Sequence, residues 1–288
     1  VYIPDSVMSI GYDAFYNCTS LISVFITDLA SWCIIDFKNS EATPLYYADY
    51  LYINGKLETD LIIPDSVSSI NYYAFSNSNA FSSVTIPEAI SYIGSMFSSC
   101  SSLTQITILN PICGITEIAP QTVIKGYDNS TAQDYANTYA HPFESLGEAP
   151  LETLYSGTLG DNLSWIITTH RELIIGGTGK MIDNIYGEEN NPWYPYKSLI
   201  KSVIIQHGVE NISDCAFWNF DQITSVAFSD TVKYIGNSAF SGCSNLKTIT
   251  IPGNVTEIRG LAFSDCTSLT DVVLETGVES IQEASFSG

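Results

Sequence analysis

Three histidines and a few short polar runs are the residues of this 288-residue chain that could carry out catalysis or hold a metal. A serine hydrolase needs a histidine base and an activated serine, yet no Gly-x-Ser-x-Gly elbow accompanies His141, His170 or His207. Zinc sites need cysteine and histidine pairs at ligand spacing, and no such pair occurs. We therefore interpret the histidines as surface or turn residues, and we expect no catalytic residue, no cofactor and no metal ligand.

The glycine-rich run Gly176–Lys180 follows an expected strand and resembles a phosphate-binding loop at first sight. That loop carries a glycine five residues before its Gly-Lys pair and a serine or threonine directly after it. Here those two positions are Ile174 and Met181. The spacing therefore favours a glycine turn after a strand over nucleotide binding.

The acidic run Gly187–Asn191 contains carboxylates and amides that could bind calcium. Known calcium loops alternate their oxygen ligands with spacer residues, and this run lacks that alternation. We interpret it as a solvated turn.

A repeat supplies the elements that would have to position any site. A dipeptide that ends in phenylalanine recurs at a spacing of 23 in the second half of the chain and returns near the start. The dipeptides are Ala14-Phe15, Ala74-Phe75, Met96-Phe97, Ala216-Phe217, Ala239-Phe240, Ala262-Phe263 and Ser285-Phe286. A fixed period between 20 and 50 residues predicts a solenoid, in which each repeat forms one coil.

A single coil of this sequence cannot be stable by itself. Residues 251–274 contain about eight apolar positions, whose burial contributes roughly 12 to 24 kcal/mol. Ordering the backbone of one coil costs roughly 23 to 46 kcal/mol. The coils must therefore stack, so that each covers the open face of its neighbour.

Each coil has a strand followed by a corner. Alternating apolar residues from Ile249 onward predict a half-buried strand in a parallel sheet. Pro252 lacks a backbone donor and ends that strand. The run Gly236–Phe240 predicts a helical-turn corner, whose phenylalanine fills the interior.

The coils resemble the BspA-type leucine-rich repeat, a family of bacterial and protist surface proteins. The resemblance rests on the Ile-Pro pairs, the Ala-Phe pairs and the cysteines, and it covers residues 3–26, 63–108 and 203–288 directly. One departure is Met96, which lies in a coil that is one residue short. The family implies a β-rich, horseshoe-like leucine-rich-repeat solenoid. A parallel sheet forms one face, and short helical turns and loops form the other.

We expect two tandem modules with a small β-hairpin cap between them. The first module has an elongated insertion coil and a closing cap, and the second begins with a β-rich capping segment. The first module is expected at residues 1–146, with the insertion coil at 27–62 and the closing cap at 110–146. A linker follows at 147–152. The capping segment of the second module is expected at 153–199 and its repeats at 200–288.

Three local signals support these segments. Asn54-Gly55 between two apolar runs predicts a hairpin inside the insertion coil. Ser130 before an Ala-Tyr-Ala pattern predicts the N-cap of a short helix in the closing cap. His170-Arg171 between two alternating runs predicts a hairpin turn.

Four of the seven cysteines share one repeated position, three residues after the coil phenylalanine. They are Cys18, Cys100, Cys243 and Cys266. Equivalent positions in neighbouring coils are about 4.8 Å apart, so distance alone does not exclude a bridge between Cys243 and Cys266. We favour buried free thiols, because cysteine is often buried and a phenylalanine fills the same position in another coil. Cys33, Cys113 and Cys215 are also expected in the core.

The charge balance limits the partners. A net charge of −21 with only ten lysines and arginines argues against binding to nucleic acid or to an anionic membrane. No run approaches the ~18 apolar residues of a membrane span, so we expect no membrane insertion in this fragment. The sequence begins and ends within a coil, from which we expect a piece of a longer protein or a trimmed chain.

The remaining candidate surface consists of the outward-facing strand positions, two in each coil. The predicted binding face contains Phe25, Thr85, Thr107, Ser225, Thr248, Thr250 and Asp271. Among the outward positions only Asp271 is expected to ionise, and acid–base catalysis needs a second titratable group in register. The face therefore suits flat contact with a protein or a glycan. The alternative, equally supported, is that small outward residues only permit close strand pairing.

The family resemblance implies a secreted or cell-surface adhesion protein that is not an enzyme. Its expected partner is a surface or matrix protein of a host or neighbouring cell, or a glycan. One alternative is a passive stalk that presents another domain, and a more remote one is a hydrolase with an unrecognised site. Open coil faces at the two ends also predict end-to-end self-association.

Overall fold

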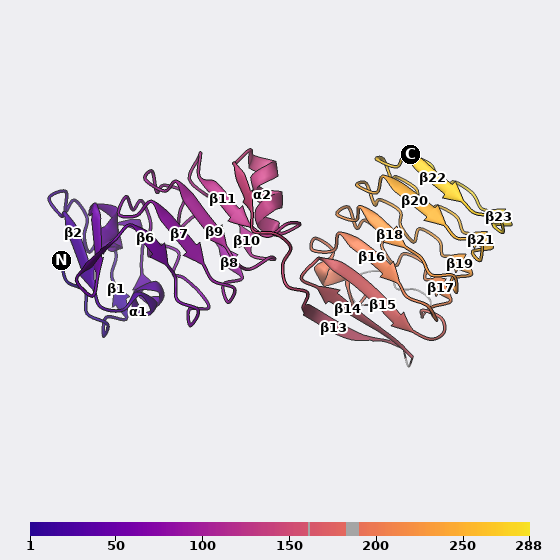
Figure 1. The fold of residues 1–288 in the computed structure, drawn as a ribbon, viewed down its shortest axis with the longest axis horizontal. Helices are drawn as coiled ribbons and strands as arrows, with labels where there is room; N and C mark the ends of the chain where they lie inside the picture. The colour runs from indigo at the N-terminus through magenta and orange to yellow at the C-terminus, as the bar shows by residue number, and fades with distance from the viewer. Residues whose placement is uncertain (161, 183–189) are drawn as a thin grey trace. The chain divides into compact units, whose positions relative to one another are not determined.

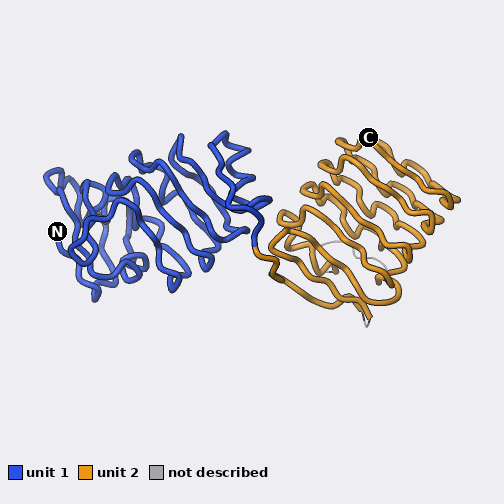
Figure 2. Tube along the Cα trace, viewed as in Figure 1, with its two compact units in different colours: residues 1–149 blue, residues 150–288 orange. Residues whose placement is uncertain are grey.

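The computed structural model of the chain describes residues 1–160, 162–182 and 190–288. These residues form two compact units, unit 1 at residues 1–149 and unit 2 at residues 150–288 (Figure 2). Each unit is a stack of coils in which most neighbouring strands are parallel (Figure 1). The predicted leucine-rich-repeat solenoid is confirmed.

The main sheet of unit 1 takes one strand from each successive coil. Its strands run parallel in the order β6 (Asp60–Ile62), β7 (Ser83–Ile86), β9 (Gln105–Ile108), β11 (Val123–Gly126) and β12 (Phe143–Ser145). A shorter parallel pair is formed by β8 (Tyr92–Ile93) and β10 (Gly114–Ile115). Along β7 half-buried and buried residues alternate, so one side of the strand enters the core and the other faces outward.

The first coil and the insertion coil add a second group of elements to unit 1. They are β1 (Ser9–Ile10), β2 (Ser23–Ile26), α1 (Leu29–Ile34), β3 (Asp36–Phe37), β4 (Tyr50–Ile53) and β5 (Lys56–Glu58), with 3₁₀ turns at Ser40–Ala42 and Pro44–Tyr46. Strand β4 pairs parallel with β2 and then turns back into β5. Asn54 and Gly55 have φ values of 52° and 79°, as a two-residue hairpin turn requires. The predicted Asn54-Gly55 hairpin is confirmed.

Unit 1 ends with a helix that packs beside its last strands. Helix α2 (Thr131–Tyr139) lies against β11 and β12 (Figure 1). The Ser130 hydroxyl caps it by accepting a hydrogen bond from the Gln133 amide at 3.2 Å. Ala132 and Ala136 are fully buried, because only small side chains fit between the helix and the coil below. The predicted helix and its N-cap are confirmed.

The main sheet of unit 2 begins with antiparallel strands and continues with parallel ones. Its elements are β13 (Thr153–Leu159), β14 (Leu163–Thr168), β15 (Glu172–Gly177), β16 (Ser202–Ile205) and β18 (Ser225–Ala227), followed by the pair β20 (Thr248–Ile251) and β22 (Asp271–Leu274). Strands β14 and β15 form the hairpin predicted around His170-Arg171, and Arg171 has a φ of 63°. Strand β15 then pairs parallel with β16, so the hairpin covers the first coil of the repeats.

A second, narrower sheet of unit 2 runs along the other side of the same coils. It contains the two-residue strands β17 (Asn211–Ile212), β19 (Tyr234–Ile235), β21 (Glu257–Ile258) and β23 (Ser280–Ile281), with a 3₁₀ turn at Tyr194–Tyr196 before the first of them. All pairs are parallel, and partners are 23 residues apart, as for Tyr234 and Glu257. The sequence period is therefore also the structural period.

Stacked phenylalanine rings fill the core between the two sheets of unit 2. The ring centroids of Phe217 and Phe240 are 4.9 Å apart, and those of Phe240 and Phe263 are 5.3 Å apart with planes only 2° from parallel. Trp193 extends this ladder by one ring, 5.7 Å from Phe217. These rings are fully buried, whereas Phe286 in the last coil is half-buried. The predicted role of the phenylalanines as core residues is confirmed.

Candidate binding surfaces

The outward face of each main sheet consists of side chains that alternate with core residues. In unit 2, Thr248 and Thr250 are exposed, whereas Ile249 and Ile251 are buried. Hydrogen-bonded register places equivalent positions of successive coils side by side, as for Thr248 and Asp271. The outward residues therefore form continuous columns along each stack.

In unit 1 the predicted binding residues lie in two places. Thr85 and Thr107 are register partners on β7 and β9, and both are half-buried. Phe25 lies on β2, where its ring stacks between Tyr2 and Tyr52 with centroid distances of 6.4 and 4.7 Å. This aromatic column was not predicted as a group, although Tyr2 lies 23 residues before Phe25, because the insertion coil displaces Tyr52 from that spacing.

In unit 2 the structure brings three predicted residues together. Thr248, Thr250 and Asp271 are exposed neighbours on β20 and β22. Ser225 lies on β18, where it is exposed and is the register partner of Ser202 on β16. The predicted residues of the two units therefore belong to separate faces, one on each main sheet.

The prediction that Asp271 is the only ionisable outward residue is wrong. Asp60 on β6, Lys125 on β11 and Glu172 on β15 also occupy outward register positions, and Lys125 forms an ion pair with Glu144 at 2.6 Å. They were missed because these strands lie outside the segments that show the motif directly. Asp60 and Lys125 are three strands apart, a separation of roughly 14 Å, so they cannot act as a concerted acid–base pair. Lys125 and Glu144 are register partners, and their charges neutralise each other in the ion pair.

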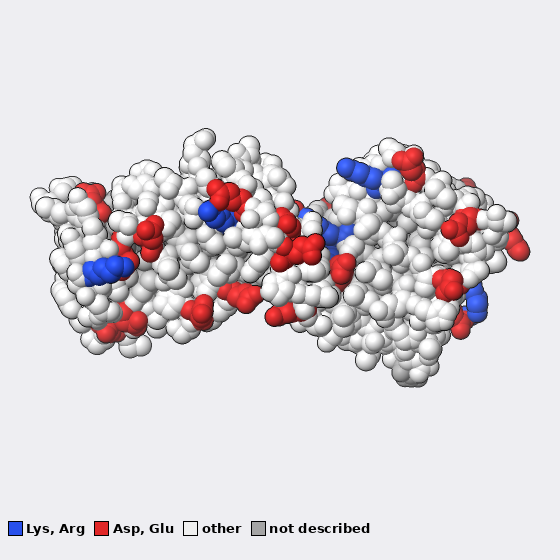
Figure 3. Space-filling view, viewed as in Figure 1, with Lys and Arg blue, Asp and Glu red and all other residues white. Residues whose placement is uncertain are grey.

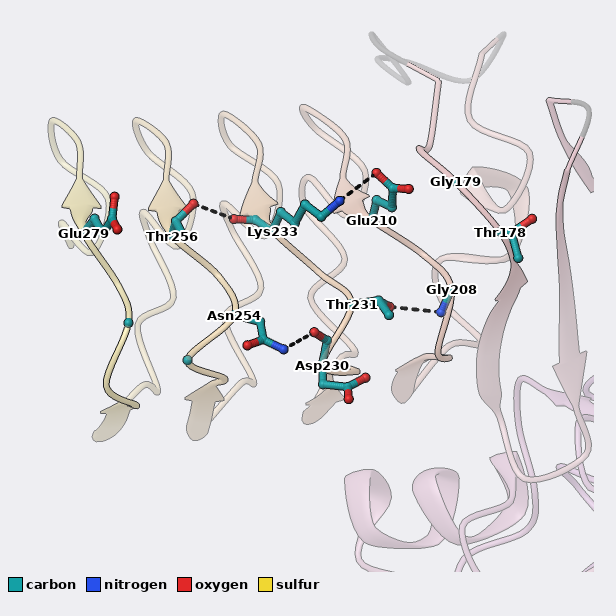
Figure 4. A pocket seen from close by; sticks show the side chains of 12 residues that line it. Thr178, Gly179, Gly208, Glu210, Asp230, Thr231, Lys233, Asn254, Thr256 and Glu279 are labelled. Atoms are coloured by element: carbon teal, nitrogen blue, oxygen red, sulfur yellow. Dashed lines mark hydrogen bonds and ion pairs between the residues drawn. The ribbon is translucent and has the colours of Figure 1, made fainter.

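Unit 2 also contains an open groove that crosses its coils (Figure 4). Its volume is about 770 Å³, and one wall carries a polar residue from each coil at intervals of 23 residues. These residues are Glu210, Lys233, Thr256 and Glu279. The groove was not predicted from the sequence, although the regular spacing of these polar positions is a signal that could have found it.

The shape of the groove follows from close stacking of the coils. Lys233 Nζ lies 3.2 Å from Oε2 of Glu210 in the preceding coil, so neighbouring wall residues bond to each other (Figure 4). A Cβ atom on Gly253 would lie 2.3 Å from the carbonyl oxygen of Thr276, and glycine is therefore required there. Within the residues that the structure describes, no cluster of three or more His, Cys, Asp or Glu side chains could hold a metal ion.

The repeat itself identifies the family. Six copies of the BspA type leucine rich repeat region match residues 1–41, 48–122 and 193–288, which is most of the chain. The chain belongs to the BspA-type leucine-rich repeat family. Helix α2 and the antiparallel strands β13 to β15 fall outside the matched residues.

Several solved bacterial proteins are similar to this BspA-type chain. A leucine-rich repeat protein from Eubacterium ventriosum is 21% identical and aligns over 43% of this chain and 45% of its own, with a TM-score of 0.31. A leucine rich cell surface protein from Faecalibacterium prausnitzii is 21% identical over 96% of this chain and 78% of its own, with a TM-score of 0.27. A leucine-rich repeat protein from Bacteroides ovatus is 18% identical over 98% and 82%, with a TM-score of 0.32.

The chain spans less than half the length of the Eubacterium ventriosum protein. No curated protein matches the chain.

The repeated cysteine position of this BspA-type chain holds free thiols. Cys100, Cys243 and Cys266 are buried, and each thiol donates a hydrogen bond to the carbonyl of a phenylalanine in the preceding coil at 3.2 to 3.3 Å. Burial raises the pKa of Cys100 to about 12 and that of Cys266 to about 11. Both thiols are therefore protonated at neutral pH, and they stabilise the turn instead of acting as nucleophiles.

The remaining cysteines differ from one another. Cys18 shares the repeated position but is exposed, so the prediction of burial is wrong for it. Phe15, three residues before it, is half-buried. Cys33 and Cys113 are buried as predicted, whereas Cys215 is half-buried.

The histidines lie at surface and turn positions, as predicted. His207 is exposed, and its Nδ1 lies 2.8 Å from Oδ1 of Asp230. His170 is half-buried in the turn between β14 and β15, and His141 is half-buried with Nδ1 3.1 Å from the carbonyl oxygen of Thr122.

The glycine-rich run ends β15. A Cβ atom on Gly177, whose φ is 113°, would lie 2.1 Å from the carbonyl oxygen of Asn162, so the glycine permits close approach to the neighbouring strand. Residues 187–189 of the acidic run lie outside the described residues. In the described part of the chain, no helix has both the length and the apolar character needed to cross a membrane.

Proposed function

We propose that this chain is a secreted or cell-surface adhesion protein that binds other proteins through the outward faces of its main sheets. The observation that carries the proposal is the aromatic column of Tyr2, Phe25 and Tyr52, whose rings stack along the outward face formed by β2 and β4. Aromatic side chains supply most of the binding energy in protein interfaces, because they bury a large area at a low entropy cost.

The outward columns of unit 2 complement that feature. Thr248, Thr250 and Asp271 are exposed donors and acceptors on a flat surface, and they permit contact without steric obstruction. On the face shown in Figure 3, acidic side chains are spread over both units and basic side chains are fewer. This charge distribution favours a protein partner over nucleic acid.

The size of one sheet indicates how strongly it binds. Five strands at ~4.8 Å and four residues at ~3.3 Å give a face of roughly 300 Å². A stable protein interface buries about 800 Å² on each partner. A partner that contacts only one main sheet is therefore bound weakly, and firm attachment requires simultaneous contacts from several sites on the same surface.

Binding of the whole chain to immobilised purified extracellular-matrix proteins tests the proposal. Thr250→Glu places a charge in the outward column and is expected to weaken saturable binding at least about tenfold. Thr256→Glu is the matched control, because it adds the same charge to the same coil but on the groove side. Retained binding in both variants would show that the sheet face of unit 2 is not the interface.

A passive stalk is the second candidate, and one observation favours it. The hydroxyl of Ser83 donates a hydrogen bond to Oδ1 of Asp60 at 2.7 Å, so some outward side chains bond to each other within the column. A stalk predicts no saturable binding to any protein of the panel and no effect of Thr250→Glu. Binding that Thr250→Glu abolishes and Thr256→Glu leaves intact would exclude the stalk.

A further inference from the structure

The corners of the coils in unit 2 are joined by backbone hydrogen bonds. The Phe217 amide donates to the Ala239 carbonyl at 2.7 Å, and the Phe240 amide donates to the Ala262 carbonyl at 2.8 Å. The same bond recurs one coil later, from the Phe263 amide. Neighbouring corners are consequently held together, and little space is left between them.

In the part of the chain that the structure describes, two corresponding corners of unit 1, those of Phe75 and Phe97, lack this backbone bond. Phe75 and Phe97 are 22 residues apart, one fewer than in the regular coils, because the coil of Met96 is short. Among the residues described here, no backbone hydrogen bond joins these two corners. A hollow of about 350 Å³, which we call the first hollow, opens at this place.

The first hollow is lined by aromatic rings and hydroxyl groups. Tyr72 and Tyr73 pack edge to face at a centroid distance of 4.9 Å, and Tyr46 lines the hollow from the insertion coil. Tyr72 is 48% exposed, and its ring lies over Gly94, where a Cβ atom would be 3.2 Å from Cε2. The other lining residues are Ser40, Ser76, Asn77, Ser95, Ser98, Ser99 and Glu117.

A second hollow of about 360 Å³ adjoins the first one, and both are lined by Glu117. Its aromatic wall consists of Tyr135 and Tyr139 on α2, with ring centroids 4.6 Å apart. Tyr139 is 62% exposed. The Tyr135 hydroxyl accepts a hydrogen bond from the Ile118 amide at 3.1 Å, which fixes the ring in place.

The chemistry of the two hollows selects among ligand classes. Neither lining contains lysine or arginine, which disfavours phosphate, sulfate and other anions. Neither is a closed apolar cavity of the kind that encloses a lipid or a drug-like molecule. Flat tyrosine rings accept the C–H face of a sugar, while serine hydroxyls, an asparagine amide and a carboxylate match its hydroxyl groups.

We propose that unit 1 binds a neutral oligosaccharide across the two hollows, on the side where the corners of its coils lie. One sugar ring packs against Tyr72 in the first hollow, and another packs against Tyr139 in the second. Glu117, which both hollows share, accepts hydrogen bonds from hydroxyl groups of both rings. This site is on a different surface from the outward sheet faces and does not depend on protein binding through them.

A microarray of neutral oligosaccharides of glucose, galactose, mannose and N-acetylhexosamines tests the site, with sialylated and sulfated versions on the same slide. The whole chain is expected to bind neutral glycans and to discriminate against the acidic ones. The strongest neutral oligosaccharide is then titrated calorimetrically. Tyr72→Ala is expected to weaken its binding about tenfold, because one aromatic contact contributes up to about 1.5 kcal/mol.

Two further variants keep the test independent of folding defects. Ser99→Trp fills the first hollow from an exposed position and is expected to abolish binding while thermal stability is retained. Asn237→Ala is the matched control, because Asn237 occupies in unit 2 the position of Tyr72, three residues before the phenylalanine, and it should have no effect.

Three outcomes would overturn the proposal. The first is that the chain binds no neutral oligosaccharide. The second is that Ser99→Trp binds the oligosaccharide as tightly as the unmodified chain does. The third is that the chain prefers the acidic glycans. Loss of matrix-protein binding in Ser99→Trp without any glycan binding would assign the hollows to a protein interface instead. If Thr250→Glu did not weaken binding to matrix proteins, protein binding through the sheet face of unit 2 would be refuted, but the proposed glycan site would not be affected.

Discussion

Units 1 and 2 each contain a buried tryptophan whose indole bonds to the next coil. In unit 1 the indole N–H of Trp32 donates to the Ala74 carbonyl at 3.2 Å, and in unit 2 that of Trp193 donates to the Ala216 carbonyl at 2.9 Å. A second polar side chain reaches each of these carbonyls, a hydroxyl in unit 1 and a side-chain amide in unit 2. The two units therefore share this hydrogen-bond arrangement although their sequences around it differ.

Beyond these tryptophans, the units differ in the regularity of their coils. In unit 2 the ring centroids of Phe217 and Phe240 are 4.9 Å apart and those of Phe240 and Phe263 are 5.3 Å apart, whereas in unit 1 those of Phe75 and Phe97 are 5.7 Å apart. Equal coil lengths in unit 2 align the backbones at every corner, and a short coil in unit 1 prevents this alignment. Strict repetition joins the corners of unit 2 by backbone hydrogen bonds, and the first hollow lies where, within residues 1–160, the short coil of unit 1 lacks such a bond.

Removal of a ladder ring is expected to have the largest effect on stability. Phe240→Ala should lower the free energy of unfolding of unit 2 by about 5 kcal/mol, and Phe97→Ala should lower that of unit 1 by about 3 kcal/mol. Phe240 is stacked on both sides, by Phe217 and Phe263, whereas Phe97 is stacked on one side, by Phe75. Urea unfolding followed by hydrogen exchange, measured separately for the peptides of unit 1 and of unit 2, gives both free energies of unfolding.

The exposed Tyr16 provides the control for this pair, because its replacement by alanine should change stability by less than about 0.5 kcal/mol. Equal losses in the two core variants would contradict the difference in packing between the units.

The tryptophans test the shared arrangement. Trp32→Phe and Trp193→Phe each remove one hydrogen bond to a buried carbonyl and some ring area, and each should cost about 1 to 3 kcal/mol. We expect similar values, because a second donor remains on the carbonyl in both units. Thermal unfolding of the two variants measures the costs. If only one of the two variants lost stability, the shared hydrogen-bond arrangement would not contribute equally to the stability of the two units.

The buried thiols predict a stability loss at alkaline pH. Burial raises the pKa of Cys100 from 9.0 to about 12, so the unfolded chain releases this proton first and the folded state loses stability between pH 9 and 12. At pH 10 the loss is about 1.4 kcal/mol for this thiol. For Cys266 in unit 2 the window is narrower, because its pKa is raised only to about 11.

The measurement is the difference in unfolding free energy between pH 8 and pH 10 for the unmodified chain and for Cys100→Ala and Cys266→Ala. Each variant should show a smaller pH dependence than the unmodified chain. Cys18, which is exposed, should react with a thiol reagent in the folded protein, whereas Cys100 should react only on unfolding. Rapid modification of Cys100 in the folded state would refute its burial.

Restoring the missing residue of the short coil should have the smallest effect on stability and the most specific one on structure. Insertion of one alanine after Ser95 gives this coil the regular length, so the corners of Phe75 and Phe97 can form the backbone bond seen in unit 2. Stability should rise by about 1 kcal/mol, the typical contribution of one hydrogen bond. Slower hydrogen exchange of the Phe75 amide would report the new bond.

The same insertion should close the first hollow and remove the glycan binding proposed for it. Insertion of one alanine after Asn54, in the hairpin loop of the insertion coil, is the length-matched control. If the insertion after Ser95 left the Phe75 amide fast to exchange, coil length would not be what separates the corners.

The sequence was sufficient to predict the parts of the fold that depend on local pattern. The spacing of the phenylalanines predicted the solenoid, Asn54-Gly55 predicted the hairpin, and Ser130 predicted the start of α2, because each signal acts through neighbouring residues or a fixed period. The burial of Cys100 was predictable for the same reason, since its position recurs in every regular coil.

The parts that were missed depend on interruptions of the pattern. Cys18 is exposed although Cys100, Cys243 and Cys266 at the same repeat position are buried, and the repeat position alone does not reveal this difference. Asp60 lies 23 residues before Ser83, but it belongs to the insertion coil and was not counted with the outward columns. The short coil of Met96 was visible in the sequence, yet the hollow beside it depends on how two corners separate in three dimensions.

The parallel register of unit 2 has a consequence for how such chains change length. Because partners in its narrow sheet are 23 residues apart at every step, duplication of one coil would extend the stack by about 4.8 Å and leave each existing interface intact. The wall of Glu210, Lys233, Thr256 and Glu279 would gain one polar residue for each added coil. Duplication of whole 23-residue coils in the gene can therefore enlarge a recognition surface by one coil at a time. An insertion of any other length would shift the register between neighbouring strands.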